Sequence, residues 1–556
     1  MTTTTRPRSH EAEVASGDRA PSADRSFLRW GVSSYLLVTL VVTAAVVVRL
    51  GGHLGYVLDD AAIHLSMADH LARDGTWGVT SGSFESASSS PLWTALVAAG
   101  LTVAPMARDV VPLALNVAAG IAVIWILAAN QTVLTPSCRR PADVIAVVVL
   151  VTTVLFLPGL AIVGMEHTLH VALVLGAVTV VHRSSQRPVT AGQDRVAYVL
   201  VALATLARFE SAFVAAGLAA GLLFTDPQRN RRRAVGLVLS AAIPAAGFAV
   251  ANRALGGGWL PNSVLAKGQA TGATSAGNGL GPVDIANRVT HDPVLVALFA
   301  VGVVYLALRS GRSARNLVPA WTLVLATAAH AVLADVGWYE RYQAYLIAIG
   351  VYLVLAVLAE ISPELRRRSL AAACVLGVLL GATKADLLVD APLAADDMYR
   401  HQYQAGRFLD RYYGGEPVAT DQLGYISLLH DGPLTDFAGL GDYEVLRART
   451  APGVDIRELW ADLSEDRGFR VAVVYDTVAL KRVPDTWIPA GRWRIDGKPV
   501  SGVTKSLEFF ATTPSEVAPL QEHLRDFEDD MPARVRLRLN ELAGFKVAQL
   551  EADGAR

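Results

Sequence analysis

The chain contains few cysteines, few charged residues and almost no net charge. Two of its 556 residues are Cys, and the formal net charge at pH 7 is -1. Cys138 lies in a short Arg-rich stretch and Cys374 in an apolar run, so the sequence does not indicate a disulfide framework. The excess of Lys and Arg that a nucleic-acid backbone would require is absent, and we expect no nucleic-acid partner.

The scarcity of charge goes with an excess of apolar side chains. Charged residues form 18% of the chain and hydrophobic residues 52%, whereas soluble domains contain roughly 25% and 45 to 50%. The mean hydropathy is +0.37. This composition predicts an α-helical, polytopic protein of the cell membrane.

Apolar runs predict where the chain crosses the bilayer. A crossing helix needs about 20 residues, and about eleven runs are long enough if the bilayer thins locally. The runs begin near Ser33, Asp109, Asp143, Glu166, Arg195, Ser211, Arg233, Asp292, Asn316, Tyr342 and Ser369. Basic residues cluster in alternate connections, which marks those connections as cytoplasmic.

One topology accommodates all of the basic clusters if the run 91–107 stays on the outer face without crossing. It predicts a disordered cytoplasmic tail at 1–30, a transmembrane module at 31–386 with an outer loop at 51–108, and an exported domain at 387–556. Amphipathic helical patterns and short strand-like runs in the last segment predict a small α/β domain.

A pair of aspartates, Asp59 and Asp60, follows the first apolar run. Adjacent carboxylates where the chain leaves the bilayer are well placed to take a proton from a hydroxyl group. They are therefore candidate catalytic residues. A divalent cation could bind the pair, but the sequence supplies no matching ligands beside it, and no metal site or cofactor is assigned.

A second candidate lies at the apex of a short apolar hairpin, 195–225, whose two ends are basic. Each arm has about 14 residues and rises about 21 Å, which is less than the thickness of the hydrocarbon core. The apex, Arg208-Phe209-Glu210, is therefore expected below the outer surface. An ionisable pair at that depth indicates a functional site, although an Arg208 to Glu210 pair that only locks the hairpin is the alternative.

The remaining candidate binding residues are polar or aromatic side chains of the predicted outer segments. They are His64, Glu85, Ser89, Ser90, Trp93, Glu166, Asn262, Lys267, Trp338 and Arg341. Trp338 could instead be an interfacial aromatic anchor. Glu166 could instead be a helix start, where a carboxylate favours the positive end of the helix dipole.

Several of these segments resemble the GT-C glycosyltransferases of the mycobacterial arabinofuranosyltransferase type. The similar segments are Asp59-Asp60-Ala-Ala-Ile-His-Leu65, Phe84-Glu-Ser-Ala-Ser-Ser-Ser-Pro-Leu-Trp93, Gly164-Met-Glu-His-Thr-Leu169, Leu206-Ala-Arg208-Phe-Glu210, Leu260-Pro-Asn-Ser-Val-Leu-Ala-Lys267, Val418-Ala-Thr-Asp421 and Thr435-Asp-Phe-Ala-Gly-Leu-Gly-Asp442. The chain departs from that family at Phe209, where Pro is usual, and at Ala62, where an aromatic residue is usual.

The resemblance implies an inverting enzyme that uses a polyprenyl-phosphate sugar at the outer face of the membrane. Asp59 or Asp60 would take the proton of the acceptor hydroxyl, and a cell-envelope glycan would be the acceptor in cell wall biogenesis. A departing phosphate gains charge, which calls for cations aimed at it. Arg208, Lys267 and Arg341 are the candidates.

Several questions about function stay open from the sequence. Arabinofuranose is the favoured sugar and mannose the second, because no residue pattern specifies hydroxyl stereochemistry. A transporter of lipid or glycan is the competing class, and it would need charged or broken helices near the bilayer midplane. A non-catalytic scaffold that binds wall polymer is the third, and it would not need the aspartate pair.

Overall fold

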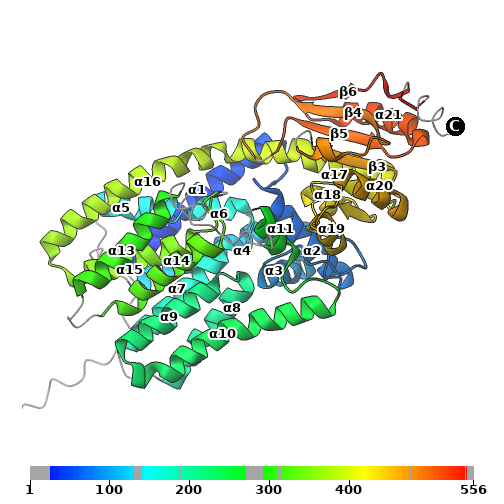
Figure 1. Cartoon of the computed structure of the whole chain (residues 1–556). Helices are drawn as coiled ribbons and strands as arrows, with labels where there is room; N and C mark the ends of the chain where they lie inside the picture. The colour runs from blue at the N-terminus through cyan, green and yellow to red at the C-terminus, as the bar shows by residue number, and fades with distance from the viewer. Residues whose placement is uncertain are drawn as a thin grey trace, which may run out of the picture.

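The chain forms an elongated bundle of helices with a β-sheet unit at one end (Figure 1). This computed structural model describes residues 25–130, 141–186, 190–270, 292–309, 315–337, 339–475, 478–501, 503–544 and 546–547. The first helix already begins at Arg25, inside the range predicted for the tail, and residues 1–24 lie outside the described part.

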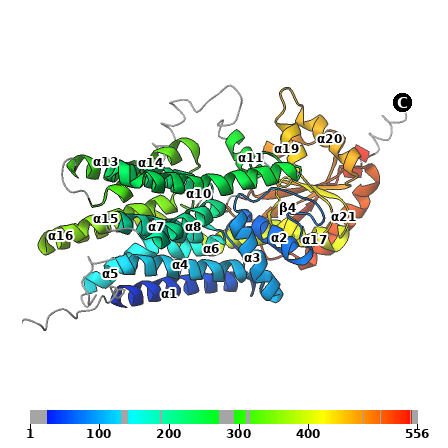
Figure 2. The same ribbon diagram turned by 90° about the horizontal axis from the view of Figure 1, so that it is seen from below.

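Helices of the first two thirds of the chain make up the bundle, and two views at right angles show most of them running side by side (Figure 2). They are α1 (Arg25–Arg49), α2 (Asp59–Asp74), α3 (Pro91–Val103), α4 (Val111–Asn130), α5 (Pro141–Val149), α6 (Leu157–Val163), α7 (His167–Ser185), α8 (Ala191–Ala207), α9 (Ser211–Thr225), α10 (Pro227–Ala254), α11 (Asn262–Ala270), α13 (Pro293–Arg309), α14 (Leu317–Leu333), α15 (Ala344–Glu360) and α16 (Pro363–Met398).

Five helical stretches in the described residues are long and apolar enough to cross a membrane. They are Ser26–Arg49, Val111–Asn130, Pro141–Val163, His167–Ser185 and Pro227–Ala254. Shorter apolar helices accompany them, namely Pro91–Val103, Ser211–Thr225, Pro293–Leu308, Leu317–Leu333 and Ala344–Glu360. The chain is a membrane protein by these measures, while the predicted number of spans and their sidedness stay predictions.

Small residues let the helical hairpin of α8 and α9 pack closely against α14. A Cβ atom added at Gly217 would lie 2.6 Å from Cα of Thr322, and one at Gly221 would lie 2.7 Å from Cα of Val318. Glycine thus lets the backbones of α9 and α14 approach closely, as small residues do between membrane helices. The helical hairpin turns at Arg208, whose backbone is extended, and this turn is the apex expected from the sequence.

The last third of the chain holds a six-stranded sheet in the order β2-β1-β3-β5-β4-β6. Strands β2, β1 and β3 are parallel, and the neighbours β3-β5, β5-β4 and β4-β6 are antiparallel. The strands are β1 (Val418–Thr420), β2 (Leu434–Asp436), β3 (Val471–Tyr475), β4 (Ile488–Ile495), β5 (Ser506–Ala511) and β6 (Val535–Leu539), and the helices are α17 (Gln404–Tyr413), α18 (Gly424–Leu429), α19 (Tyr443–Arg449), α20 (Ile456–Arg467) and α21 (Val517–Asp526).

Aromatic side chains fill the two faces of the sheet. On one face Trp460 of α20 stacks on Phe437, with ring centroids 4.1 Å apart. On the other face Trp493 of β4 packs against Phe408 of α17 and Phe527. The central strand β3 is buried along its whole length, as expected for a strand covered on both faces.

The sheet unit is fixed to α2 and to the segment that precedes it. The backbone N–H of Tyr56 donates to the Tyr425 hydroxyl at 3.0 Å, and the Ser66 hydroxyl of α2 donates to the Ser427 carbonyl of α18 at 2.9 Å. Helix α16 runs along the module and leads into the sheet unit through a π-helical turn at Tyr399–Tyr403 (Figure 1). The start of α2 is therefore held between the two parts of the chain.

The predicted topology can be tested by thiol labelling in a background of Cys138→Ser and Cys374→Ser. Helix α3 has 13 residues and rises about 20 Å, too short to cross the hydrocarbon core. We expect Arg108→Cys to react with an impermeant thiol reagent added outside the cell, and Gln186→Cys to react only after permeabilisation. The opposite pattern at either position would contradict the predicted sidedness.

Candidate active site

Asp59 and Asp60 form the first turn of α2, which begins after an extended residue, Leu58. Carboxylates are favourable at this position because the first backbone N–H groups of a helix lack intrahelical partners. The Asp60 N–H donates to Oδ1 of Asp59 at 3.0 Å. Ala61 and Ala62 behind them are buried, so packing fixes the helix while both carboxylates stay partly exposed.

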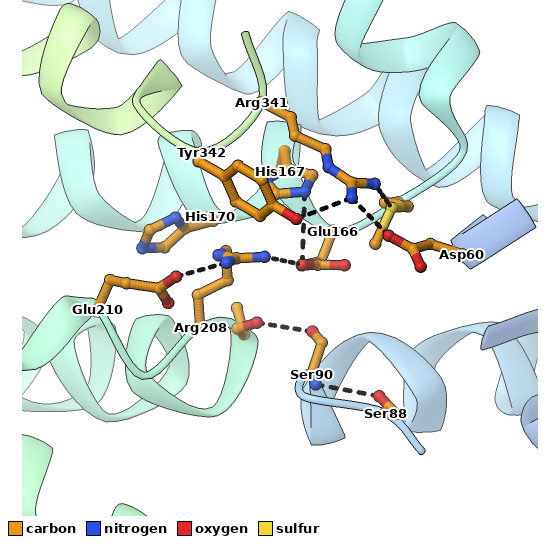
Figure 3. A network of polar contacts seen from close by, with 12 residues as sticks. Asp60, Ser88, Ser90, Glu166, His167, His170, Arg208, Glu210, Arg341 and Tyr342 are labelled. Carbon is orange, nitrogen blue, oxygen red and sulfur yellow. Dashed lines mark hydrogen bonds and ion pairs between the residues drawn. The ribbon is translucent and has the colours of Figure 1, made fainter. Parts of the chain in front are cut away.

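Asp60 pairs with Arg341, a residue from the turn before α15. Nη2 of Arg341 donates to Oδ2 of Asp60 at 2.5 Å and to the Tyr342 hydroxyl at 2.9 Å (Figure 3). Nη1 of Arg341 lies 2.7 Å from the sulfur of Met165. Arg341 is only 3% exposed, so the Asp60 carboxylate is the counter-ion of a buried cation.

The pKa of the Asp59 carboxyl is shifted from its ordinary value. Burial and the neighbouring charge of Asp60 raise the pKa of Asp59 to about 6, while a hydrogen bond from Gln402 and the charge of Arg341 act in the lowering direction. A carboxyl group with a pKa near the working pH is suited to exchange a proton with a substrate. Asp60, by contrast, is held in the ion pair with Arg341.

A second ion-pair cluster surrounds Arg208 at the turn between α8 and α9. Nη1 of Arg208 donates to Oε1 of Glu166 at 2.6 Å, and Nη2 pairs with Glu210 (Figure 3). The sequence suggested Glu210 alone as the partner, and the structure adds Glu166. Because the Glu166 carboxylate is fully buried and Glu210 keeps 19% of its side chain exposed, the Glu166 pair is the one closed to water.

Tyr342 connects the two arginines. Its ring centroid lies 4.8 Å from Cζ of Arg341 and 5.3 Å from Cζ of Arg208, so the ring contacts both guanidinium groups. Cation–π attraction at such distances contributes about 0.5–2 kcal/mol. The sequence analysis did not single out Tyr342 as a site residue, although it directly follows Arg341.

The turn that presents Arg341 has an unusual backbone. Tyr339 and Glu340 both have positive φ angles, 63° and 56°, which side-chain-bearing residues rarely adopt. Nε2 of Gln343 donates to the Glu340 carboxylate at 2.7 Å and helps to hold the turn. Strained residues of this kind persist where the surrounding structure fixes them, often at functional sites.

His64 links the Glu166 carboxylate to the outer loop. Its Nε2 lies 3.7 Å from Oε2 of Glu166, and its Nδ1 lies 3.1 Å from the Ser88 hydroxyl. The Ser90 backbone donates to the same hydroxyl, and the Ser90 side chain donates to the carbonyl of Ala207 at 2.6 Å. The loop is thereby tied to the residue that precedes Arg208. Ser88 was not among the predicted binding residues, and Ser89 beside it is half-buried.

Three predicted binding residues have structural contacts instead of facing this cluster. Glu85 accepts hydrogen bonds from the N–H groups of Val79 and Thr80 at 2.7 and 3.0 Å, which closes its own loop. Trp93 is buried in the apolar core beside Leu65. Asn262 bonds the Ser86 carbonyl through its N–H and the Leu440 carbonyl through its side chain. Their predicted contact with substrate stays a prediction.

Two other predicted residues fall outside the description. Trp338 is not among the described residues, and nothing is described of the Lys267 side chain, whose backbone lies in α11. Within the described residues, no group of three or more His, Cys, Asp or Glu side chains is arranged to hold a metal ion.

The fold has known counterparts. ArnT from Cupriavidus metallidurans in the apo state is 12% identical to this chain, with a TM-score of 0.51 over 86% of this chain and 98% of ArnT. The archaeal oligosaccharyltransferase AglB from Archaeoglobus fulgidus is 14% identical, with a TM-score of 0.45 over 94% and 78% of the two chains. The arabinofuranosyltransferase AftD from Mycobacteria is 13% identical, with a TM-score of 0.38 over 88% and 41%. The likeness to ArnT shows that the two chains share a fold, in agreement with the resemblance to GT-C glycosyltransferases noted in the sequence.

Sequence comparisons are less informative. One family profile matches residues 394–513, and its description is "Domain of unknown function (DUF8728)". No curated protein matches the chain at a significant level. The matched segment covers the end of α16 and most of the sheet unit.

The two carboxylates paired with Arg208 should affect stability unequally when the arginine is removed. Arg208→Met leaves Glu166 buried without its cation, and loss of one partner of a buried pair typically costs about 3–5 kcal/mol. We expect a marked fall in the melting temperature of the detergent-solubilised protein. A second change, Glu166→Gln, should restore more of it than Glu210→Gln, because Glu210 is partly hydrated. Equal restoration by the two changes would contradict this assignment.

Proposed function

We propose that the chain is an inverting glycosyltransferase at the outer face of the cell membrane. It moves a sugar from a polyprenyl-phosphate donor to a cell-envelope glycan, with arabinofuranose the favoured sugar and mannose the alternative. The observation that carries the proposal is the position of a carboxyl group of raised pKa, Asp59, beside an Asp60–Arg341 pair, together with a second arginine, Arg208, that contacts the same Tyr342 ring as Arg341. The GT-C fold supports the same class of reaction.

In the proposed reaction Asp59 is the general base. The acceptor hydroxyl oxygen attacks the anomeric carbon and forms the new C–O bond, its proton passes to Asp59, and the bond from the anomeric carbon to the phosphate oxygen breaks. Attack from the face opposite the phosphate inverts the configuration. Asp60 is less suited to the role because its charge is held by the ion pair with Arg341.

The leaving phosphate gains negative charge, which Arg341 and Arg208 would stabilise. Both guanidinium groups are already paired with carboxylates, and a phosphate that approaches from water would most easily replace the more exposed partner. Asp60 and Glu210 keep 24% and 19% of their side chains exposed, whereas the Glu166 carboxylate is fully buried. We expect the donor phosphate to take the place of Glu210 or Asp60 while Glu166 stays bound to Arg208. Lys267 stays a further candidate for this contact.

A transporter is the second candidate, and one observation favours it. The stretch from α5 to α6 is interrupted by a π-helical turn at Leu150–Val154 and by Phe156, which has a positive φ angle of 52°. Nζ of Lys384, a buried residue of α16, lies 3.5 Å from the Val154 carbonyl and 3.8 Å from a Glu340 carboxylate oxygen. Broken helices with buried charge occur at transporter sites, although here the lysine also satisfies the carbonyl that the break releases.

Reconstitution distinguishes the two functions. The purified chain in lipid vesicles is given radiolabelled polyprenyl-phosphate arabinose or polyprenyl-phosphate mannose together with a synthetic octyl arabinofuranoside. Label in a larger glycoside supports the transferase and identifies the sugar. Movement of labelled lipid between leaflets without any glycoside product would support the transporter.

Replacement of each aspartate tests the assignment of the base. Asparagine keeps the size of the side chain and removes the basic oxygen, so we expect Asp59→Asn to lower the transfer rate by about 10² to 10⁴. Asp60→Asn should lower the transfer rate less than Asp59→Asn. It should also leave the Arg341 side chain less fixed, because the ion pair is lost. A rate near that of the wild type in Asp59→Asn would contradict the assignment, and so would a larger loss in Asp60→Asn.

The pH dependence of transfer gives an independent measurement. A base works only when deprotonated, so kcat/KM of the wild type should fall as the pH drops below about 6, the pKa of Asp59. The residual activity of Asp59→Asn should lack this acidic limb. A wild-type profile that stays flat down to pH 4 would exclude Asp59 as the titrating group.

A further inference from the structure

A residue of the turn that leads into the sheet unit lies beside Asp59, the proposed base. A π-helical turn, Tyr399–Tyr403, lies between α16 and α17 and carries Gln402, a residue that is 1% exposed. Gln402 lies beside Asp59, and hydrogen bonding between the two side chains acts to lower the pKa of the Asp59 carboxyl. Single π-helical turns are rare and frequently lie at functional sites, because the extra residue re-aims neighbouring side chains.

Gln402 also contacts the loop that follows β1. Its Nε2 donates to Oε1 of Gln422 at 3.3 Å, and its Oε1 accepts from the Tyr425 N–H at 3.3 Å. A Cβ atom added at Gly424 would lie 2.3 Å from Oε1 of Gln402 and 2.7 Å from Cβ of Asp59. Glycine at this position therefore allows the sheet unit to pack against the base.

Asp421 and Gln422 lie at the carboxyl end of β1, in the parallel part of the sheet formed by β2, β1 and β3. Ligands of α/β sheets bind outside the carboxyl ends of parallel strands. The Tyr475 N–H, at the end of β3, donates to Oδ1 of Asp421 at 3.2 Å and fixes that side chain. Asp421 and Gln422 are both half-buried, so they are positioned by neighbours and still open to a ligand.

The surroundings of Asp59 differ in charge from one side to the other. The charged and titratable groups that act on it are Asp60 of α2, Arg341 before α15, Tyr425 of α18 and Tyr475 of β3. The only cation among them is on the side of Arg341. The side of the sheet unit offers amide and carboxyl groups, which suit sugar hydroxyls and do not suit a phosphate.

We infer that Asp421 and Gln422 form the subsite for the hydroxyl groups of the acceptor saccharide, and that Gln402 is a positioning residue that orients Asp59 toward that subsite. The inference rests on the proposed function. It gives the sheet unit a role in recognition of a neutral polyhydroxylated acceptor, with the donor phosphate on the opposite, arginine side of Asp59. The carboxyl and amide groups of the subsite can each pair with one acceptor hydroxyl.

Steady-state kinetics of Asp421→Asn and Gln422→Ala separate acceptor recognition from donor recognition. One lost hydrogen bond contributes about 0.5–1.5 kcal/mol, or roughly a 2- to 12-fold change in affinity. We expect the KM for octyl arabinofuranoside to rise by that factor in each variant, with the KM for the donor within twofold of the wild type. Asp485→Asn is the matched control in the same unit, because the Asp485 side chain is 92% exposed. Unchanged acceptor KM in both variants would overturn the subsite.

The pH profile tests the role of Gln402. Gln402→Leu removes a hydrogen bond that favours the charged form of Asp59, so the acidic limb of kcat/KM should move to higher pH. If the Gln402 contact matters only for folding, the Gln402→Leu variant should have a lower melting temperature and an unchanged acidic limb. That outcome would overturn the positioning role.

Glycoside binding measured without donor tests the acceptor subsite independently of the proposed reaction. Binding of octyl arabinofuranoside and of octyl mannoside to the full chain is measured without donor by isothermal titration calorimetry. A glycoside that binds the wild type and binds Gln422→Ala more weakly supports the subsite even if no transfer is detected, in which case only the proposed reaction fails. Transfer by the wild type, with equal glycoside binding by wild type and variant, would overturn the subsite alone.

Discussion

The burial of two guanidinium groups in the helical module, beside the start of α2, is the constraint on which the site depends. A charge removed from water without a partner costs several kcal/mol, so carboxylates must be brought to Arg208 and Arg341. Glu166 and Glu210 approach Arg208, and Asp60 approaches Arg341. These contacts join the start of α2, the α8–α9 hairpin and the turn before α15. Beside the Asp60–Arg341 pair, burial and the charge of Asp60 raise the pKa of Asp59 to about 6.

The sequence was informative wherever a charge interrupts an apolar run. Asp59, Asp60, Arg208 and Glu210 stand out because ionisable groups near a membrane are costly and seldom accidental. The helical hairpin with its apex at Arg208 followed from the length of its two arms. The resemblance to GT-C glycosyltransferases was confirmed at the level of the fold by the likeness to ArnT. The number of spans, their sidedness and the sugar stay predictions.

Contacts between distant segments could not be read from the sequence. Gln402 approaches Asp59 only because a π-helical turn ends α16 and the sheet unit packs on α2, and no local spacing encodes either event. Tyr342 contacts both arginines through a turn with two positive φ angles in non-glycine residues, which residue type alone does not reveal. Glu85 and Trp93 are residue types that occur in sugar sites. In the structure Glu85 closes its own loop and Trp93 lies in the core, and their contact with substrate stays a prediction.

In the proposed arrangement a donor side with arginines and an acceptor side with amide groups lie on opposite sides of Asp59. The structure of the full chain with a non-transferable polyprenyl-phosphonate sugar tests this arrangement most directly. The account predicts the phosphonate on Arg341 or Arg208, with Asp60 or Glu210 displaced, and the anomeric carbon facing Asp59 with room for an acceptor oxygen at about 3–3.5 Å. A phosphonate bound beside Gln402 and Gln422, with both arginine ion pairs intact, would contradict it.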